Sequence, residues 1–508
     1  MKIRLIEPKP PGVNVYDRSR LPRLGLPLLG EILHRAGHDV TIYVETIAPV
    51  DWYDVSQADL VGFSTTTSTA PAAYKMAARM KEIGVPTVIG GSHVTFLTDE
   101  ALAHCDFVVR GEGQTTLPEL VEAIEKGGTF KSIEGLSYRD ADGRICHNAG
   151  RPPCTQEEFA ALPAPNLHLI AGHERMTQMP YMTSWGCPYG CDFCSVIHMF
   201  GRQMRYRPVE TILDDLESFR SGSTVFFYDD NFVVNKTRTK ELLRGIIRRK
   251  LNFQWTTQMR ASAVFKDGKT GELDRELLGL MKASGCVAVY CGFESVNQAT
   301  LDAYNKHQNV SEVENAIRAF HAYEIHVHGM FVFGADTDTA DTFDETATFA
   351  LRNRIDTVQF VVLTPMPGTP LAKRLKETDR ILSKDWSLYD AHYCVFQPKN
   401  MSAYECQWRT HRAMMKFYAP EHSIRILALT LPKLLLREQR VLYEQAKAFL
   451  LSGNLLETMI GFSQDSLRQL KNTLALPTLR LYALRQLQKW AEEAPKKTPW
   501  DQPLPAMR

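Results

Sequence analysis

The sequence predicts an α/β protein in which a doubly wound, Rossmann-like parallel sheet precedes a partial barrel of six strand–helix units and a helical C-terminal region. Strand and helix patterns alternate over about the first 125 residues. A second alternation follows and gives six strands, after which only helical patterns remain. The length of 508 residues also exceeds one core, since domains have roughly 100 to 200 residues. We expect a first domain at 1–130, a hairpin and linker at 131–178, a barrel at 179–400 and a helical region at 401–508.

Composition and charge are those of an ordinary globular protein. Hydrophobic residues make up 44% and charged residues 23% of the chain. A net charge of +1 gives no electrostatic reason to expect a nucleic-acid partner. The start "MKIRLIEPKP" lacks the apolar core of a signal peptide, and no apolar run reaches the roughly 18 residues of a spanning helix. Ten cysteines are too few for a secreted disulfide framework, so we expect a reducing, cytoplasmic location.

In the first domain, short apolar segments have the pattern of strands, and amphipathic segments between them have the pattern of helices. The expected strands are 2–8, 39–44, 58–65, 86–91 and 107–113, and the expected helices are 26–37, 70–84, 99–105 and 116–127. Ligands of such sheets bind beyond the carboxyl ends of the strands. Three of these ends are "GFSTTTST", "IGGSHVTF" and "RGEGQTT", in which small residues let a large ligand approach the backbone and hydroxyl groups can hold its polar rim.

The second half begins after a hairpin and a proline-broken linker. The hairpin is expected in "GLSYRDADGRICHNAG", with its turn at Asp142–Gly143. The pattern of a partial barrel follows, with its site at the carboxyl ends of the strands. Its expected strands lie within 180–187, 224–230, 253–260, 287–295, 326–336 and 357–369.

Three cysteines in one short loop, "SWGCPYGCDFCSVIHMFG", are the strongest chemical signal. Cys187, Cys191 and Cys194 have the spacing C-x3-C-x2-C. Thiolates bind iron–sulfur clusters or zinc, and three cysteines on a four-iron cluster leave one iron open to chelate a small molecule. Gly186 and Gly190 allow the loop to fold tightly around such a cluster. A Cys3His zinc site that includes His198 is the competing interpretation, and a disulfide with one spare thiol is a third.

Because this cysteine motif stands at the start of a partial barrel, the chain resembles the radical S-adenosylmethionine (SAM) enzymes. The resemblance implies a [4Fe-4S] cluster whose open iron binds SAM, and reductive cleavage of SAM to a 5′-deoxyadenosyl radical. It also places Phe193 beside the adenine and Glu294 at the ribose hydroxyls. Asp229 and Asp230 would equally suit a helix cap, and Glu294 a solvated strand end. The SAM-binding residues that the resemblance implies are Phe193, Tyr228, Asp229, Asp230, Gln258, Arg260, Glu294 and Ser295.

The first domain is similar to that of one subgroup, the cobalamin-binding radical SAM enzymes, which also share "DWSLYDAHYCVF" (385–396). The motif D-x-H-x-x-G does not occur, so the resemblance implies cobalamin bound without a histidine ligand from the protein. His93 is expected either at the corrin rim or in a structural hydrogen bond. The implied cobalamin-binding residues are Ser64, Thr65, Thr66, Gly90, Gly91, His93, Gly111, Glu112 and Gly113.

Three functions follow from these cofactors. The first is methylation of an unactivated carbon, by way of the 5′-deoxyadenosyl radical and methylcobalamin. The second is an oxidative cyclase or a rearrangement enzyme acting on a tetrapyrrole-like or lipid-like substrate, because relatives of both kinds share the last motif. The third, from another class, is a cobalamin-binding sensor with a zinc site. Oxygen-free conditions are expected to be required for the first two.

The expected partners are a small-molecule substrate of hydrophobic character and an electron donor such as flavodoxin or ferredoxin. The segment 423–451 mixes leucines with Arg425, Lys433, Arg437 and Arg440. Such a basic amphipathic helix either packs on its own protein or lies on a membrane surface. The sequence favours the first and leaves the second open.

Overall fold

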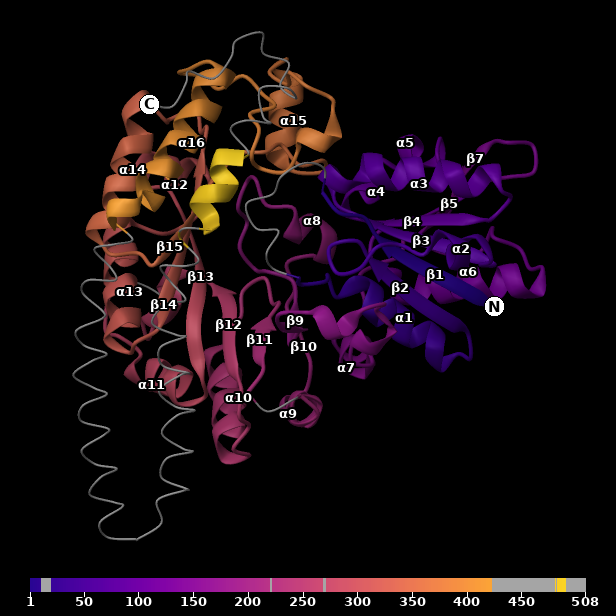
Figure 1. The fold of residues 1–508 in the computed structure, drawn as a ribbon, viewed down its shortest axis with the longest axis horizontal. Coiled ribbons are helices and arrows are strands. Elements are labelled where there is room, and N and C mark those ends of the chain that lie inside the picture. The colour runs from indigo at the N-terminus through magenta and orange to yellow at the C-terminus, as the bar shows by residue number, and fades with distance from the viewer. Residues whose placement is uncertain (11–19, 220–221, 268–270, 423–479, 481, 490–508) are drawn as a thin grey trace.

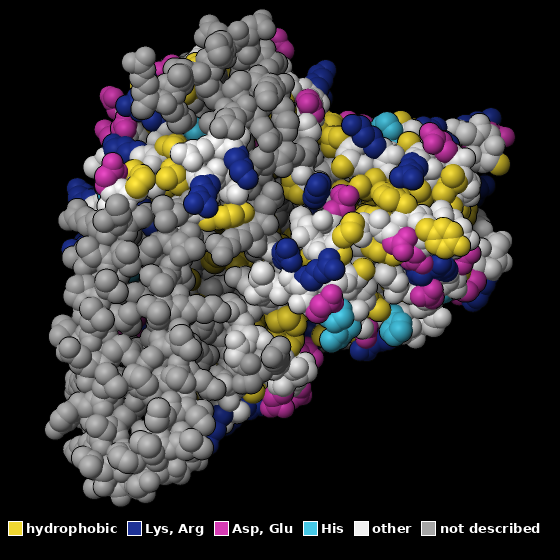
Figure 2. Space-filling model, in the orientation of Figure 1, with side chains coloured by type: hydrophobic (Ala, Val, Ile, Leu, Met, Phe, Trp, Pro, Cys, Tyr) yellow, Lys and Arg dark blue, Asp and Glu magenta, His cyan; other side chains and the backbone are white. Residues whose placement is uncertain are grey.

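The computed structural model describes residues 1–10, 20–219, 222–267, 271–422, 480 and 482–489. The N-terminal domain and the barrel lie side by side, with the cysteine loop and helix α8 (Val196–Phe200) between them (Figure 1). Lys, Arg, Asp and Glu side chains are interspersed over the visible face of the N-terminal domain, in keeping with the net charge of +1 (Figure 2).

The first sheet has seven strands in the order β2-β1-β3-β4-β5-β6-β7. The strands β1 to β5 pair in parallel, whereas β6 and β7 form an antiparallel hairpin at the edge beside β5. The hairpin expected in the linking segment therefore extends this sheet, and Gly143 in its turn has a φ of 76°. The strands are β1 (Lys2–Glu7), β2 (Asp39–Val44), β3 (Leu60–Thr65), β4 (Thr87–Gly91), β5 (Phe107–Val109), β6 (Leu136–Arg139) and β7 (Ile145–His147).

Helices cover both faces of this sheet, because its central strands are apolar on both sides. One face packs with α1 and α6 into a core that includes Leu5, Leu33 and Leu120. The other packs with α3 and its neighbours into a core that includes Phe63 and Ala77. This arrangement confirms the doubly wound sheet. The helices are α1 (Gly25–Arg35), α2 (Trp52–Ser56), α3 (Ala70–Glu82), α4 (Ser92–Phe96), α5 (Thr98–Leu102) and α6 (Gly113–Lys126).

The linker contains α7 (Gln156–Ala161) and leads to a second sheet of six parallel strands in the order β15-β14-β13-β12-β11-β8. Alternate side chains of these strands, such as Phe227, Trp255 and Phe331, are buried against the outer helices. The predicted partial barrel is thereby confirmed. Its strands are β8 (Met179–Tyr181), β11 (Thr224–Phe227), β12 (Gln254–Met259), β13 (Cys286–Glu294), β14 (His326–Phe333) and β15 (Thr357–Val362).

The helices of the barrel follow its strands in turn, and a short two-stranded ladder lies next to the cysteine loop. The helices are α9 (Val209–Glu217), α10 (Lys236–Arg248), α11 (Arg275–Ala283), α12 (Gln298–Ala303), α13 (Val310–Ala322), α14 (Ala340–Arg352) and α15 (Pro370–Glu377). The ladder pairs β9 (Ser184–Trp185) with β10 (Arg205–Tyr206), and α8 lies between these strands in the chain.

Helix α16 (Ala403–Tyr418) and the helical residues 480 and 482–489 confirm helical structure after residue 400. The buried Arg480 donates to the carbonyl oxygen of Asp356 over 3.1 Å and lies over the ring of Phe417. The basic segment 423–451 lies outside the described residues. In the part of the chain that the structure describes, no helix combines the length and the apolar character needed to cross a membrane.

Candidate functional site between the two domains

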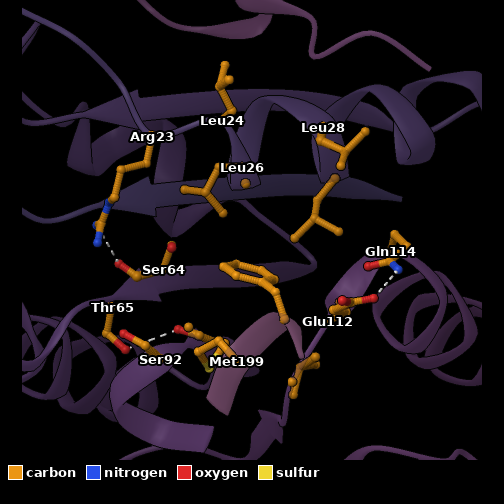
Figure 3. Close-up of a pocket in the computed structure, with 18 of the residues that line it drawn as sticks. Arg23, Leu24, Leu26, Leu28, Ser64, Thr65, Ser92, Glu112, Gln114 and Met199 are labelled. Carbon is orange, nitrogen blue, oxygen red and sulfur yellow. Dashed lines mark hydrogen bonds between the residues drawn. The ribbon is translucent and has the colours of Figure 1, made fainter. Parts of the chain in front are cut away.

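A cavity of about 380 Å³ lies where the N-terminal domain meets the barrel, and both domains contribute to its wall. From the first sheet come the loops that follow β3, β4 and β5, which are the three strand ends singled out in the sequence. Figure 3 shows Ser64, Thr65, Ser92, Glu112 and Gln114 around this space. Of the expected cobalamin-binding residues, the structure brings eight to this cavity: Ser64, Thr65, Thr66, Gly90, Gly91, Gly111, Glu112 and Gly113.

The floor of the cavity depends on Gly91, because β3 and β4 approach each other closely there. Gly91 has a φ of 111°, a conformation that residues with a side chain rarely adopt. A Cβ atom at this position would overlap the carbonyl oxygen of Thr65. The hydroxyl group of Thr65 donates to the carbonyl oxygen of Gly90 over 3.1 Å and fixes the same two strand ends. Backbone and small side chains therefore form this part of the wall, so a large ligand can lie close to the backbone.

His93 lies outside this wall, in a structural position. Its side chain is fully buried, its Nε2 lies 3.2 Å from Glu100, and its ring packs edge-on against Trp386 of the barrel half. Burial lowers the pKa of His93, which favours the neutral ring. Glu100 also accepts from Trp386 Nε1 over 3.0 Å and from the hydroxyl group of Tyr74 over 3.1 Å. These groups join α4 and α5 to the segment that contains "DWSLYD".

The cysteine loop turns at Gly186, whose φ of 93° and close approach to Gln203 leave no room for a side chain. Burial raises the pKa of Cys187, and it raises the pKa of Cys194 to about 11, with a further contribution from the charges of Cys191 and Cys187. Metal binding must release the protons of such thiol groups.

The described residues contain no group of three or more His, Cys, Asp and Glu side chains arranged to hold a single metal ion. A four-iron cluster differs from a single ion because its ligands bind separate corners of a cube. Three thiol groups on one glycine-containing loop, in the spacing C-x3-C-x2-C, fit such a cluster. The cysteines Cys187, Cys191 and Cys194 are the residues that would hold it.

The loop after β11 places two expected SAM-binding residues on the cavity wall, Tyr228 and Asp230. Burial, together with the smaller effect of the charge of Asp229, raises the pKa of Asp230 to about 7. Asp229 instead points into the protein, where it accepts from the backbone N–H and the hydroxyl group of Thr183, over 3.0 and 2.7 Å, and from the hydroxyl group of Ser184. The structure therefore places Asp229 as a support for the strand end that leads to the cysteines.

The remaining expected SAM-binding residues lie at the carboxyl ends of β12 and β13 or in the cysteine loop. Gln258 is in register with Tyr290 on the neighbouring strand. Arg260 lies over the ring of Tyr189 of the cysteine loop, 4.0 Å from its centre. The ring of Phe193 packs edge-on against Tyr304. Glu294 and Ser295 are buried; Glu294 pairs with Lys306, and the hydroxyl group of Ser295 accepts from the backbone of Asn297.

Sequence reasoning missed the apolar wall of the cavity. Leu24, Leu26 and Leu28 reach it from the start of α1 (Figure 3), and Trp185, Met199 and Phe200 reach it from the other domain. The leucines fit the pattern of an ordinary core helix, so no local signal marks them as ligand-facing. Arg23 was also missed, although it stands directly before that helix; it donates to the carbonyl oxygen of Ser64 over 3.2 Å.

This cavity fits a large, mostly apolar ring system. It combines the backbone floor at Gly91, the leucine wall and a polar edge formed by Glu112 and Gln114, which are bonded to each other over 3.1 Å. The fold and site therefore define a two-domain cofactor-binding enzyme, in which a doubly wound domain faces a cysteine-containing partial barrel.

Comparison with known proteins gives this class its family. A model of the B12 binding domain matches residues 12–121, and a model of the Radical SAM superfamily matches residues 181–350. An uncharacterized methyltransferase of Pyrococcus horikoshii is 30% identical over 82% of this chain and 92% of its own length. Bacteriochlorophyllide d C-12(1)-methyltransferase of Chlorobaculum tepidum is 32% identical over 72% of this chain and 75% of its own length.

A cyclase is also similar to this chain. Anaerobic magnesium-protoporphyrin IX monomethyl ester cyclase of Cereibacter sphaeroides is 29% identical over 68% of this chain and 57% of its own length. The solved structure of the cobalamin-dependent SAM radical enzyme OxsB has the same fold, with a TM-score of 0.66 and 16% identity over 99% of this chain and 82% of that chain. The chain belongs to the cobalamin-binding radical SAM enzymes, which confirms the predicted family and the cofactors, cobalamin and SAM with an iron–sulfur cluster.

Proposed function

We propose that this enzyme transfers a methyl group to an unactivated carbon of a small, largely hydrophobic molecule. The observation that carries the proposal is the shared cavity, since the strand-end loops of the B12 binding domain and residues next to the cysteine loop line one space. A hydrogen-abstracting centre and a methyl donor must act on the same carbon, so both must reach one site. The methyltransferase relatives favour this outcome.

When bound, the cofactors supply the difficult chemistry: reductive cleavage of SAM yields the hydrogen-abstracting radical, and the corrinoid supplies the methyl group. The protein contributes placement and shielding. Leucines of α1 and the side chains of Trp185, Met199 and Phe200 keep the wall apolar, which limits access of water to a reactive centre. Tyr228 and Asp230 provide polar groups on the barrel side.

The assignment of ligands to residues is part of the proposal. Cys187, Cys191 and Cys194 hold the cluster, while Tyr228, Asp230 and Glu294 are the principal polar contacts of SAM. The strand-end loops that line the cavity, with Gly91 among their residues, hold the corrinoid. Asp229 and His93 have supporting roles, because their side chains are taken up by Thr183 and Ser184 and by Glu100, respectively.

An oxidative cyclase is the second candidate, favoured by the similarity to the Cereibacter sphaeroides cyclase. Both candidates need the same cofactors and one electron for each cleaved SAM. We propose that a flavodoxin or ferredoxin supplies this electron and that the reaction takes place in the cytoplasm.

The deciding experiment follows the methyl carbon of SAM. The full-length protein is reconstituted without oxygen with iron, sulfide and cobalamin, reduced with dithionite, and incubated with methyl-labelled SAM and an extract of small molecules from its own cells. Methyl transfer predicts 5′-deoxyadenosine together with a labelled organic product, and Cys191→Ala should form neither. Formation of 5′-deoxyadenosine with an altered but unlabelled product would favour the cyclase, and absence of 5′-deoxyadenosine under all conditions would overturn both.

A further inference from the structure

A buried ion pair between Lys306 and Glu294 lies at the carboxyl end of β13, and Lys306 has no role in the function described so far. The Nζ atom of Lys306 lies 2.6 Å from Oε1 of Glu294, and the two side chains are only 8% and 9% exposed. The hydrogen bond from Lys306 goes to Oε1 of Glu294 and not to Oε2. The lysine thus holds one carboxylate oxygen and does not engage the other.

The backbone around Glu294 is shaped for this pair. Glu294 has a φ of 63°, in the left-handed region that few residues other than glycine adopt, and the register between β13 and β14 shifts between Gly292 and Glu294. A Cβ atom on Gly292 would overlap Oε1 of Glu294 and lie 3.0 Å from the Nζ atom of Lys306. The missing side chain at Gly292 therefore provides the space that the pair occupies. Strain of this kind persists where the surrounding structure enforces it, often at functional sites.

The segment that carries Lys306, residues 304–308, also contacts the cysteine loop. The side-chain amide of Asn305 donates to the carbonyl oxygen of Gly190 over 3.0 Å. The backbone N–H of Asp192 donates to the carbonyl oxygen of Tyr304 over 3.3 Å. Two points of contact therefore fix this segment against the loop of the three cysteines.

Arg260, which directly follows β12, also links the segment 304–308 to the cysteine loop. It donates to the carbonyl oxygen of Lys306, and its guanidinium group lies over the ring of Tyr189 in the cysteine loop. Glu294 is consequently held in a defined position relative to the cysteine loop through Lys306 and its neighbours, although these residues are about a hundred positions apart in the sequence.

We propose that Lys306 is a positioning residue for SAM, which holds one carboxylate oxygen of Glu294 and so directs the second oxygen toward the ribose hydroxyl groups. Removal of one partner from a buried ion pair leaves the other charge uncompensated, so without Lys306 the carboxyl group would lose the contact that fixes its orientation. This inference rests on the proposed function, because it assumes that SAM binds at the carboxyl ends of the barrel strands.

The test compares Lys306→Met, Lys306→Arg and a control, Lys282→Met, in the full-length protein reconstituted without oxygen. Lys282 forms an exposed ion pair with Glu324 at 3.0 Å, so its loss removes a lysine of no consequence for the site. Equilibrium dialysis measures the affinity for SAM, and iron content and the midpoint of thermal unfolding are measured on the same samples. We expect Lys306→Met to bind SAM about 10- to 100-fold more weakly at unchanged iron content, and Lys306→Arg to restore affinity to within about threefold.

A SAM analogue without the 2′-hydroxyl group adds a readout that a purely structural role would not affect. The parent protein should bind the analogue more weakly than SAM, whereas Lys306→Met should bind the two almost equally, because the contact is already lost. Parental SAM affinity in Lys306→Met, or loss of SAM affinity and iron together, would overturn the inference and leave the proposed function standing. Failure of the parent protein itself to bind SAM would overturn the proposed function, and the inference with it.

Discussion

Arg205 and Glu112 form a buried ion pair that joins the two domains beside the cavity. Nη1 of Arg205 lies 2.6 Å from Oε1 of Glu112, and the side chains are 2% and 4% exposed. Glu112 follows β5 of the first sheet, whereas Arg205 begins β10, a few residues after the cysteine loop. Glu112 also accepts from the backbone N–H of Cys154 over 2.9 Å. One carboxylate thus ties a strand-end loop of the B12 binding domain to the barrel.

We expect Arg205→Met to lower the free energy of unfolding by about 3 to 5 kcal/mol, because it leaves the buried carboxylate of Glu112 without its partner. Chemical denaturation followed by fluorescence measures the change. The control Arg352→Met removes an exposed pair with Glu314 at 2.8 Å and should cost less than about 1 kcal/mol. Equal effects of the two substitutions would contradict a role of the Arg205–Glu112 pair in domain contact.

The iron content should depend on the cysteine loop and on no other cysteine of the described residues. Cys191→Ala removes one of three thiolate ligands, so bound iron and sulfide should fall to less than about a tenth of the parental amount after oxygen-free reconstitution. Cys146→Ala, at a half-buried position on β7 in the first sheet, should keep both. Retention of iron by Cys191→Ala would refute the assignment of the cluster to this loop.

Gly91→Ala should disturb the floor of the cavity, because the added Cβ atom overlaps Thr65 and the backbone has a left-handed φ. We expect a loss of about 2 to 4 kcal/mol in stability and weaker retention of cobalamin, measured by absorbance after gel filtration. Gly150, where an added Cβ meets no atom within 4 Å, is the matched position for a harmless Gly→Ala substitution. A Gly91→Ala protein that keeps both stability and cobalamin would show that the close approach of β3 and β4 is unnecessary.

A pH-dependent contribution to stability is expected from Asp356, which accepts from His321 over 3.0 Å and from His326 over 2.9 Å. The bond to Asp356 raises the pKa of His326. Burial alone would raise the pKa of Asp356, but the two histidines hold it well below its usual range. The stabilisation that protonated His326 gains from Asp356 is fully present below the pKa of histidine in the unfolded chain. It is lost as the pH rises through the raised pKa of His326 in the folded protein. The Asp356 contribution is lost only in strong acid.

Asp356→Asn should therefore cost more stability at about pH 5.5 than at about pH 9, by less than about 1 kcal/mol because His326 is largely exposed. Denaturation curves at the two pH values measure this difference. Asp302→Asn, which removes a carboxylate bonded to the uncharged Gln298 over 2.9 Å, should show the same cost at both. A larger cost of Asp356→Asn at high pH would reverse the assigned sign.

The sequence allowed both sheets, the hairpin and the cysteine loop to be predicted, because each depends on a local pattern. A short continuous apolar run marks β3 and a 3.6-residue periodicity marks α3, and the spacing of Cys187, Cys191 and Cys194 marks a metal-binding loop. The glycines at the end of β4 were expected to let a ligand approach the backbone, whereas the close approach of Gly91 to Thr65 emerges only from the structure. The positions of the Asp229 and His93 side chains could not be predicted, since a sequence does not show whether a polar side chain faces a ligand or the protein interior.

Sequence by itself determined the order of the secondary-structure elements, through residue type and spacing, and it indicated the family and the cofactors through the resemblance of its motifs to those of known enzymes. The tertiary structure alone decided which side chains share the cavity: the leucines of α1 with Met199 and Phe200, Glu112 with Arg205, and Glu294 with Lys306. Such contacts arise when two domains and six strand ends pack together. Their geometry depends on distances between residues remote in the chain, which no local pattern encodes.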